Sequence, residues 1–210
     1  MVATEINGAI CWRSGLAIDA DGAPRAYGPP GKPALDFLDN AGSAQTGWYG
    51  VVVDGDGNPV EQGPDDPAPG FYVSPTALCD PSRRPEDPRR YVDSSAVPYV
   101  SIPRELRAQG VRLGDLAWVC YRAGTPGERH CEAIVADVGP RGRYGEGSIA
   151  LAEALGIPSS PKRGGVDSGV AFAIFRGSAA DPPWPRDPQD IRDRARELLA
   201  AWGADNLARI

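Results

Sequence analysis

Residues 133–157 read Ala-Ile-Val-Ala-Asp-Val-Gly-Pro-Arg-Gly-Arg-Tyr-Gly-Glu-Gly-Ser-Ile-Ala-Leu-Ala-Glu-Ala-Leu-Gly-Ile, and this segment is the most informative part of the sequence about its fold. It begins as an apolar run typical of a strand and turns sharply at Gly139-Pro140. A glycine-rich loop follows, and from Ser148 the chain is rich in helix formers until Gly156 stops it. The order predicts a strand, a turn, a loop and a short helix over residues 148–155.

Two carboxylates flank the loop. Asp137 ends the apolar run, and Glu146 lies between two glycines just before the helix. A turn-capping Asp and a helix-start Glu would explain both residues structurally. The chemical alternative is a pair in which one carboxyl donates a proton and the other activates water, as inverting glycosidases require at a separation of roughly 6.5 to 9.5 Å. Eight intervening residues with three glycines can fold back to that distance.

The rest of the chain favours a loop-rich, mainly β domain. It has 210 residues with 26 Gly and 22 Pro, yet 41% of residues are hydrophobic, which argues against disorder. A second helix is predicted from Pro188 to Trp202, with Asp187 as its cap and Gly203 as its stop. Short apolar runs bounded by turn residues predict strands at 48–53, 70–73, 99–102, 116–121, 131–137 and 170–175.

Several other functions are disfavoured. A net charge of −6 argues against nucleic-acid partners, and no apolar stretch is long enough for a membrane span or has the form of a signal peptide. The four cysteines lack the short spacing of zinc sites, so no metal is expected. Cys120 and Cys131 lie at similar distances from a turn, which leaves a cross-strand disulfide and two free thiols as alternatives. The single histidine, His130, lies in a predicted strand, which disfavours a histidine-dependent hydrolase.

The segments ADVGP (136–140) and GEGSIALAEALGI (145–157) resemble the catalytic segment of the fungal-type chitosanases of glycoside hydrolase family 75. Further blocks resemble that family in the same order, so that the resemblance covers roughly residues 17–178; they are AIDADG (17–22), WYGVVVD (48–54), DPAPGFYVSPTAL (66–78), YVDSSAVPYVSIP (91–103) and GDLAWV (114–119). The resemblance implies that Asp137 is the catalytic base, that Glu146 is the acid, and that the reaction inverts.

The same segment resembles, more distantly, the strand-turn-helix of double-psi β-barrel proteins such as rare-lipoprotein-A-type lytic transglycosylases, although Arg141 stands where those proteins have Phe. This resemblance implies a mainly β, six-stranded double-psi-like β-barrel with a short helix after the catalytic loop and a C-terminal amphipathic helix. Residues 1–178 are expected to form the barrel, and residues 179–210 a linker and a helix packed on it.

The expected activity is therefore inverting endo-hydrolysis of β-1,4 bonds in chitosan by a monomer without metal or cofactor. Cleavage of peptidoglycan strands and a non-catalytic carbohydrate-binding or effector-like module are the alternatives. A chitosan-degrading enzyme would act outside the cell. Asp19 and Asp21 are candidates to pair with protonated glucosamine amines, unless they form an ordinary turn. Aromatic rings can stack on sugar faces, and Tyr144 is a better candidate for this than Trp48 or Tyr49.

One piece of local chemistry opposes the expected division of labour. A carboxylate just ahead of a helix is stabilised in its charged form by about 0.3 to 1 kcal/mol, which would lower the pKa of Glu146. Burial can raise the pKa of a carboxyl by several units, so Glu146 can remain the acid if the site is partly dry.

Overall fold

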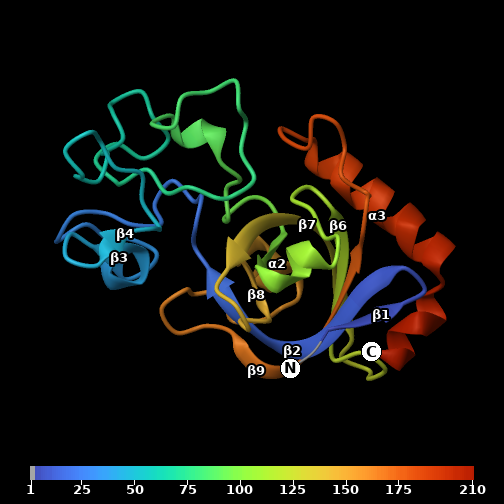
Figure 1. Ribbon diagram of the computed structural model, residues 1–210. Helices are drawn as coiled ribbons and strands as arrows, with labels where there is room; N and C mark the ends of the chain where they lie inside the picture. The colour runs from blue at the N-terminus through green and yellow to red at the C-terminus, as the bar shows by residue number, and fades with distance from the viewer. Residues whose placement is uncertain (1–2) are drawn as a thin grey trace.

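The structure, a computed structural model, describes residues 3–210, and its centre is a closed six-stranded β-barrel (Figure 1). The strands follow one another round the barrel in the order β2-β8-β5-β7-β6-β9, and β9 pairs back with β2 to close it. A short outer strand, β1 (Thr4–Ile6), pairs with β2. The barrel strands are β2 (Ala9–Asp19), β5 (Tyr99–Pro103), β6 (Leu116–Tyr121), β7 (Arg129–Gly139), β8 (Glu146–Ser148) and β9 (Val166–Phe175). The expected mainly β barrel is confirmed.

The sheet is mixed, because β2–β8 and β5–β7 pair in parallel and the other barrel pairs are antiparallel. The long strand β2 serves two neighbours in turn, since its first part pairs with β9 and its last three residues pair with β8. The register shifts between Ser14 and Leu16, which marks a bulge at Gly15. A Cβ at Gly15 would lie 2.2 Å from the Val166 carbonyl oxygen, so the close approach of β2 and β9 requires glycine there.

Large apolar side chains fill the inside of the barrel. Trp12 and Phe172 are cross-strand partners whose rings stack with centroids 4.8 Å apart and planes 6° apart. Leu16, Ile102 and Ile174 are fully buried in the same cluster. The core therefore holds the strands in one fixed arrangement.

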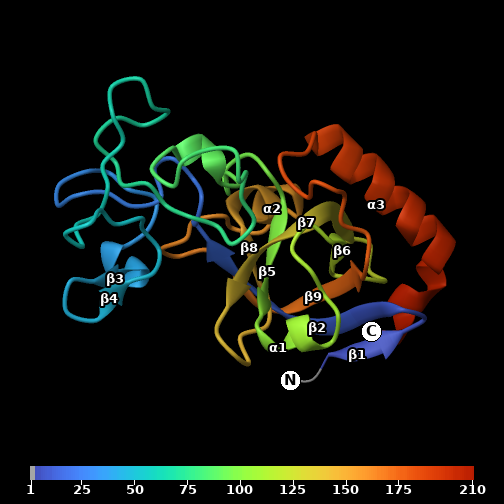
Figure 2. The same ribbon diagram turned by 45° about the horizontal axis from the view of Figure 1, so that its top comes forward.

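Residues 3–210 contain three α-helices: α1 (Glu105–Ala108), α2 (Ile149–Ala154) and α3 (Pro188–Trp202). Both predicted helices are present, and α3 has the predicted bounds, cap and stop. Figure 2 shows α3 along the outside of the barrel. Its buried residues Ile191 and Ala195 pack with Leu116 and Ile134 of the wall, and Arg196 pairs with the buried Glu132 of β7 at 2.6 Å. No helix within residues 3–210 is long and apolar enough to span a membrane.

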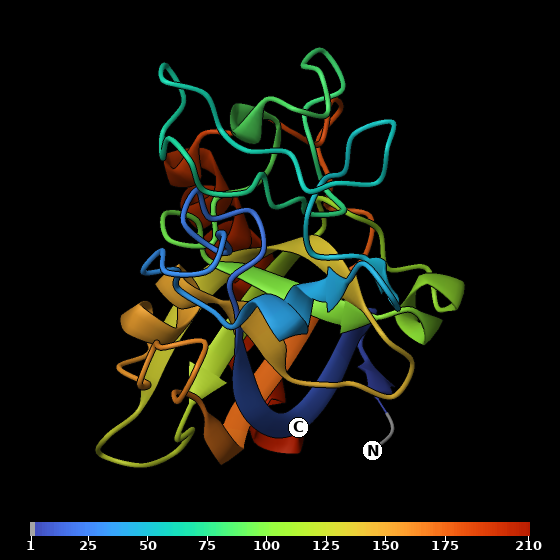
Figure 3. The same cartoon turned by 90° about the vertical axis from the view of Figure 1, so that its left-hand side faces the viewer.

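Residues 20–98 form an extended insertion between β2 and β5. It contains mostly turns, with the short elements η1 (Leu38–Ala41), β3 (Gly42–Ser43), β4 (Gly47–Trp48) and η2 (Pro88–Arg90). Tyr27, Ala41 and Val51 belong to a buried hydrophobic cluster within the insertion, separate from the barrel core. Figure 3 shows the insertion over the upper end of the barrel.

The strands predicted at 48–53 and 70–73 are wrong, because both segments lie in this insertion. Beyond β4, these two segments take part only in isolated bridges, between Val53 and Pro59 and between Glu61 and Tyr72. Val51 and Val73 are buried nonetheless. These apolar runs therefore pack in the insertion and have no partner strand in the barrel.

Of the two alternatives for Cys120 and Cys131, the structure has free thiols and no cross-strand disulfide. All four cysteines lie within the described residues, and all four are free. Across the β6–β7 pair Cys120 faces His130, and Cys131 faces Val119. That offset of one residue puts the two thiols on opposite faces of the sheet, since side chains alternate along a strand. Cys131 packs inside the barrel and Cys120 on its outside.

Candidate active site

Three adjacent strands bring Asp137 and Glu146 together. Ser101 on the middle strand, β5, pairs with Glu146 of β8 on one side and with Asp137 of β7 on the other. Directly paired residues project from the same face of a sheet. The two acids therefore stand on the same face, on either side of Ser101.

The Glu146 side chain reaches across β5 toward β7. Its Oε2 atom lies 3.0 Å from the place where a Cβ of Gly139 would stand. Gly139 follows Asp137 by two residues on β7. The Glu146 carboxyl therefore lies beside the strand that carries Asp137.

Both acids line a cavity of about 710 Å³ between the barrel and the insertion. Asp19, at the end of β2, and Asp21, just beyond it, line the same cavity, as does Asp36 of the insertion. The cavity thus brings together five carboxylates from four separate parts of the chain. Arg104 and Arg143 are the basic residues in its lining.

Asp137 is half-buried, and its Oδ1 atom accepts a hydrogen bond from the Ala77 N–H at 2.8 Å. Burial raises the pKa of its carboxyl, while the backbone N–H groups of Ala77 and Val138 work in the opposite direction. The amide of Ala77 belongs to the insertion. The insertion therefore both encloses this carboxyl and stabilises its charged form.

The Glu146 side chain is only 15% exposed, and its carboxyl lies 3.5 Å from Arg143 Nε. Burial raises the pKa of Glu146; Arg143 lowers it, the negative charge of Asp137 raises it, and the Ser101 hydroxyl lowers it. Helix α2 contributes little, because its first amides bind other groups. The Ser148 hydroxyl accepts from Leu151 N–H, and the Ser94 hydroxyl accepts from Ile149 N–H.

Asp19 and Asp21 form a linked pair. The Asp21 N–H donates to Asp19 Oδ1 at 2.9 Å, which is the turn anticipated from the sequence, and the Tyr27 hydroxyl donates to Asp21 Oδ1 at 2.9 Å. Burial raises the pKa of both carboxyls, and neighbouring acids raise it further: Asp137 and Glu146 act on Asp19, and Asp19 on Asp21. Asp19 and Asp21 thus form a turn and also line the cavity.

Tyr144 lies elsewhere and does not line the cavity. Its ring packs against the edge of Trp12, with centroids 5.7 Å apart and planes at 67°, beside the barrel core. Trp48 is half-buried against the insertion's own cluster. The aromatic residue that lines the cavity in an accessible position is Tyr49, which is 69% exposed.

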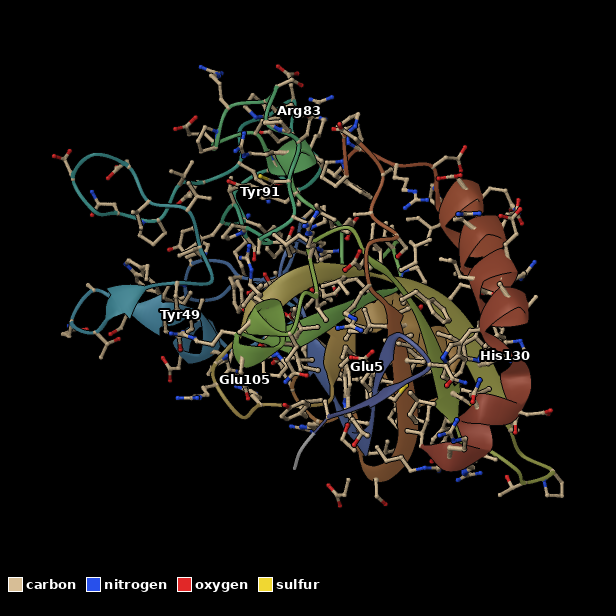
Figure 4. All side chains as sticks on the ribbon, turned by 45° about the vertical axis from the view of Figure 1, so that its right-hand side comes forward. Glu5, Tyr49, Arg83, Tyr91, Glu105 and His130 are labelled. Carbon is tan, nitrogen blue, oxygen red and sulfur yellow. The ribbon has the colours of Figure 1, made fainter. Side chains whose placement is uncertain are left out.

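Figure 4 shows Tyr49 on the insertion and His130 on the far side of the molecule, near α3. The His130 ring stacks on Trp118 at 4.5 Å, away from the acids. Within residues 3–210, no cluster of three or more His, Cys, Asp or Glu side chains is placed to hold a metal ion.

Two residues of the site had no recognised signal in the sequence. Asp36 is buried at the cavity, with both carboxylate oxygens 3.0 Å from the Asn40 amide nitrogen. Ser101 stands as a single polar residue among the apolar residues of YVSIP. An isolated serine in an otherwise apolar strand was the one available signal.

No family model matches the chain, and no curated protein matches it. The fold and the site define a closed β-barrel with a cavity, between barrel and insertion, that brings together two half-buried carboxyls and further acids.

Proposed function

We propose that this chain is a glycoside hydrolase that cleaves β-1,4 bonds within chitosan chains with inversion at the anomeric carbon. The observation that carries the proposal is the placement of Asp137 and Glu146 on either side of Ser101, within one cavity. An inverting reaction needs room for a water molecule between its two carboxyls, and β5 separates the strands that hold this pair.

In the proposed reaction Glu146 is protonated and gives its proton to the glycosidic oxygen as the bond from that oxygen to the anomeric carbon breaks. A water molecule attacks the opposite face of that carbon, and Asp137 takes the water's proton. Asp137 suits the base because two backbone N–H groups stabilise its charged form. Glu146 suits the acid because burial and the charge of Asp137 both favour its protonated form.

The additional acids favour a cationic substrate. Asp19, Asp21 and Asp36 line the cavity that holds the catalytic pair. Protonated amines of glucosamine units would form charge-assisted hydrogen bonds with these carboxylates and relieve their mutual repulsion. An uncharged glycan such as chitin offers no such compensation, which favours chitosan.

The positions of the family-like segments support membership of glycoside hydrolase family 75. Segments 17–22, 66–78, 91–103 and 136–140 lie far apart in the sequence, yet each contributes residues to the site. They supply, in order, Asp19, Ala77, Ser101 and Asp137. Convergence on one cavity is expected of segments related by function and is not required of a barrel alone.

Release of reducing ends from soluble chitosan, chitin and peptidoglycan by the purified chain tests the proposal. We expect activity on chitosan, with the anomeric form of the first product opposite to that of the substrate by NMR. Glu146→Gln and Asp137→Asn should each lower kcat by at least about 100-fold, since each removes one proton-transfer group. Glu153→Gln and Asp167→Asn are matched controls, because these acids are exposed and do not line the cavity.

Other outcomes would redirect the assignment. Cleavage of peptidoglycan alone would indicate a different glycan on the same barrel. Binding to a glycan without release of reducing ends would indicate a carbohydrate-binding module. Glu146→Gln with near-normal turnover would refute the acid assignment.

A further inference from the structure

Ser101 is the residue that separates the two acids, and it is almost fully buried. It lies in β5, whose five residues are all buried, and it is 1% exposed. Its cross-strand partners are Asp137 and Glu146. A polar side chain at this position is unusual, because an apolar residue of similar size would pack there without cost.

The Ser101 hydroxyl makes no hydrogen bond of normal geometry with another described residue. Other buried serines of the site differ. The Ser94 hydroxyl donates to the Asp19 carbonyl oxygen and accepts from Ile149 N–H, and the Ser148 hydroxyl accepts from Tyr99 N–H and Leu151 N–H. Buried hydroxyls are nearly always paired, so an unpaired one calls for a functional explanation.

The nearest suitable acceptor is the Glu146 carboxyl. A Cβ placed on Gly139 would lie 3.0 Å from Glu146 Oε2 and 3.5 Å from Ser101 Oγ, so both oxygens border this point of the site, and the Ser101 hydroxyl lowers the pKa of Glu146. We propose that Ser101 is the positioning residue of the acid: its hydroxyl donates to one oxygen of Glu146 and so turns the protonated oxygen toward the scissile bond. This role rests on the proposed hydrolase function. Such bonds often become well aligned only when substrate is bound.

The same contact stabilises Glu146 after it has given up its proton. Other charges also face Glu146: Arg143 from the preceding loop, Asp137 from β7, and Asp19 and Asp21 from the end of β2. Ser101 acts with Arg143 to lower the pKa of Glu146, against burial and Asp137. Loss of the hydroxyl should therefore raise this pKa and move the basic limb of the pH–rate profile to higher pH.

Stability provides a second readout that separates positioning from folding. Ser101→Ala removes a buried hydroxyl whose one contact, with Glu146, falls short of a normal hydrogen bond, so Tm should change little. Ser94→Ala is the matched control, because it removes a buried hydroxyl with two partners and should lower Tm. A fall in Tm for Ser101→Ala as large as that for Ser94→Ala would overturn the proposal, because the hydroxyl would then be structural.

The decisive experiment measures kcat, KM and the pH–rate profile on soluble chitosan for wild type, Ser101→Ala and Ser101→Thr. We expect Ser101→Ala to lower kcat by about 10- to 100-fold with KM within about twofold, and to shift the basic limb upward. Ser101→Thr retains the hydroxyl and should recover most of the loss. An unshifted basic limb, or kcat within twofold of wild type, would overturn the Ser101 role alone. An inactive wild-type chain would overturn the proposed function, and this role with it.

Discussion

Gly139→Ala tests the placement of the Glu146 carboxyl with the smallest possible change. The new methyl carbon would lie 3.0 Å from Glu146 Oε2, whereas ordinary contact begins at 3.4 Å. The carboxyl must therefore move by about 0.4 Å. If a displacement of about 1 Å costs on the order of 100-fold in rate, this shift should lower kcat about fivefold to tenfold, or about 1 to 1.4 kcal/mol of transition-state stabilisation.

The fold should tolerate this substitution. The crowded atom is the end of a flexible side chain, and Gly139 lies in β7 without a positive φ. Gly→Ala at a compatible position stabilises a protein by about 0.4 to 1 kcal/mol through the unfolded chain. Thermal melts and reducing-end assays on soluble chitosan, run in parallel, should show an unchanged or higher Tm with reduced kcat.

Gly55→Ala is the matched control, because a Cβ there meets nothing within 4 Å and Gly55 has no positive φ. It should leave kcat unchanged. If Gly139→Ala keeps kcat within twofold of this control, the carboxyl does not need its observed position, and the acid role of Glu146 would lose its geometric basis.

Three further predictions follow from burial and exposure. Asp19→Asn should raise Tm at pH 7 and not at pH 3. Folding raises the pKa of the Asp19 carboxyl, so the stability it contributes is present below its unfolded pKa of about 4 and is lost as pH rises through its pKa in the folded protein. An equal effect on Tm at both pH values would contradict this. Tyr49→Ala should raise KM for chitosan about fivefold with kcat unchanged, since a stacked ring contributes on the order of 1 kcal/mol, and an unchanged KM would exclude a stacking role. Thiol titration with a chromogenic disulfide should detect at most one rapidly reacting thiol in the native chain and four after unfolding, because burial raises the pKa of three cysteines; fewer than four would reveal a disulfide. The raised pKa is about 12 for Cys11, about 11 for Cys120 and about 12 for Cys131.

Local signals in the sequence were sufficient for the helices and for several strands. Helix α3 follows its predicted bounds because its start and stop are encoded next to it: Asp187 accepts from Gln189 N–H, and Gly203 adopts a positive φ of 91°. Strand β6 also has its predicted bounds. In both cases the deciding contacts lie within a few residues or on one continuous apolar run.

Features that depend on distant partners could not be predicted in this way. The sequence does not predict strand β2, because Arg13, Ser14 and Gly15 interrupt its apolar run, and its partner β9 lies about 150 residues further along the chain. The run at 48–53 is apolar and predicts a strand, but it has no partner strand in the barrel, and only Trp48 belongs to a strand, where it pairs with Gly42 of β3. Ser101 gains its significance only from the register that places it between the two acids.

The same distinction applies to the division of labour between Asp137 and Glu146. The sequence alone predicts that the nearby helix favours a charged Glu146, but in the fold the first amides of α2 donate to the hydroxyls of Ser94 and Ser148. The cation beside Glu146, Arg143, is 57% exposed, and solvent weakens a pair of that kind. Asp137 keeps two backbone donors that favour its charge, and this charge in turn favours a proton on Glu146. These contacts, which come from the insertion, the barrel and the loop between β7 and β8, support the proposed assignment of Asp137 as base and Glu146 as acid.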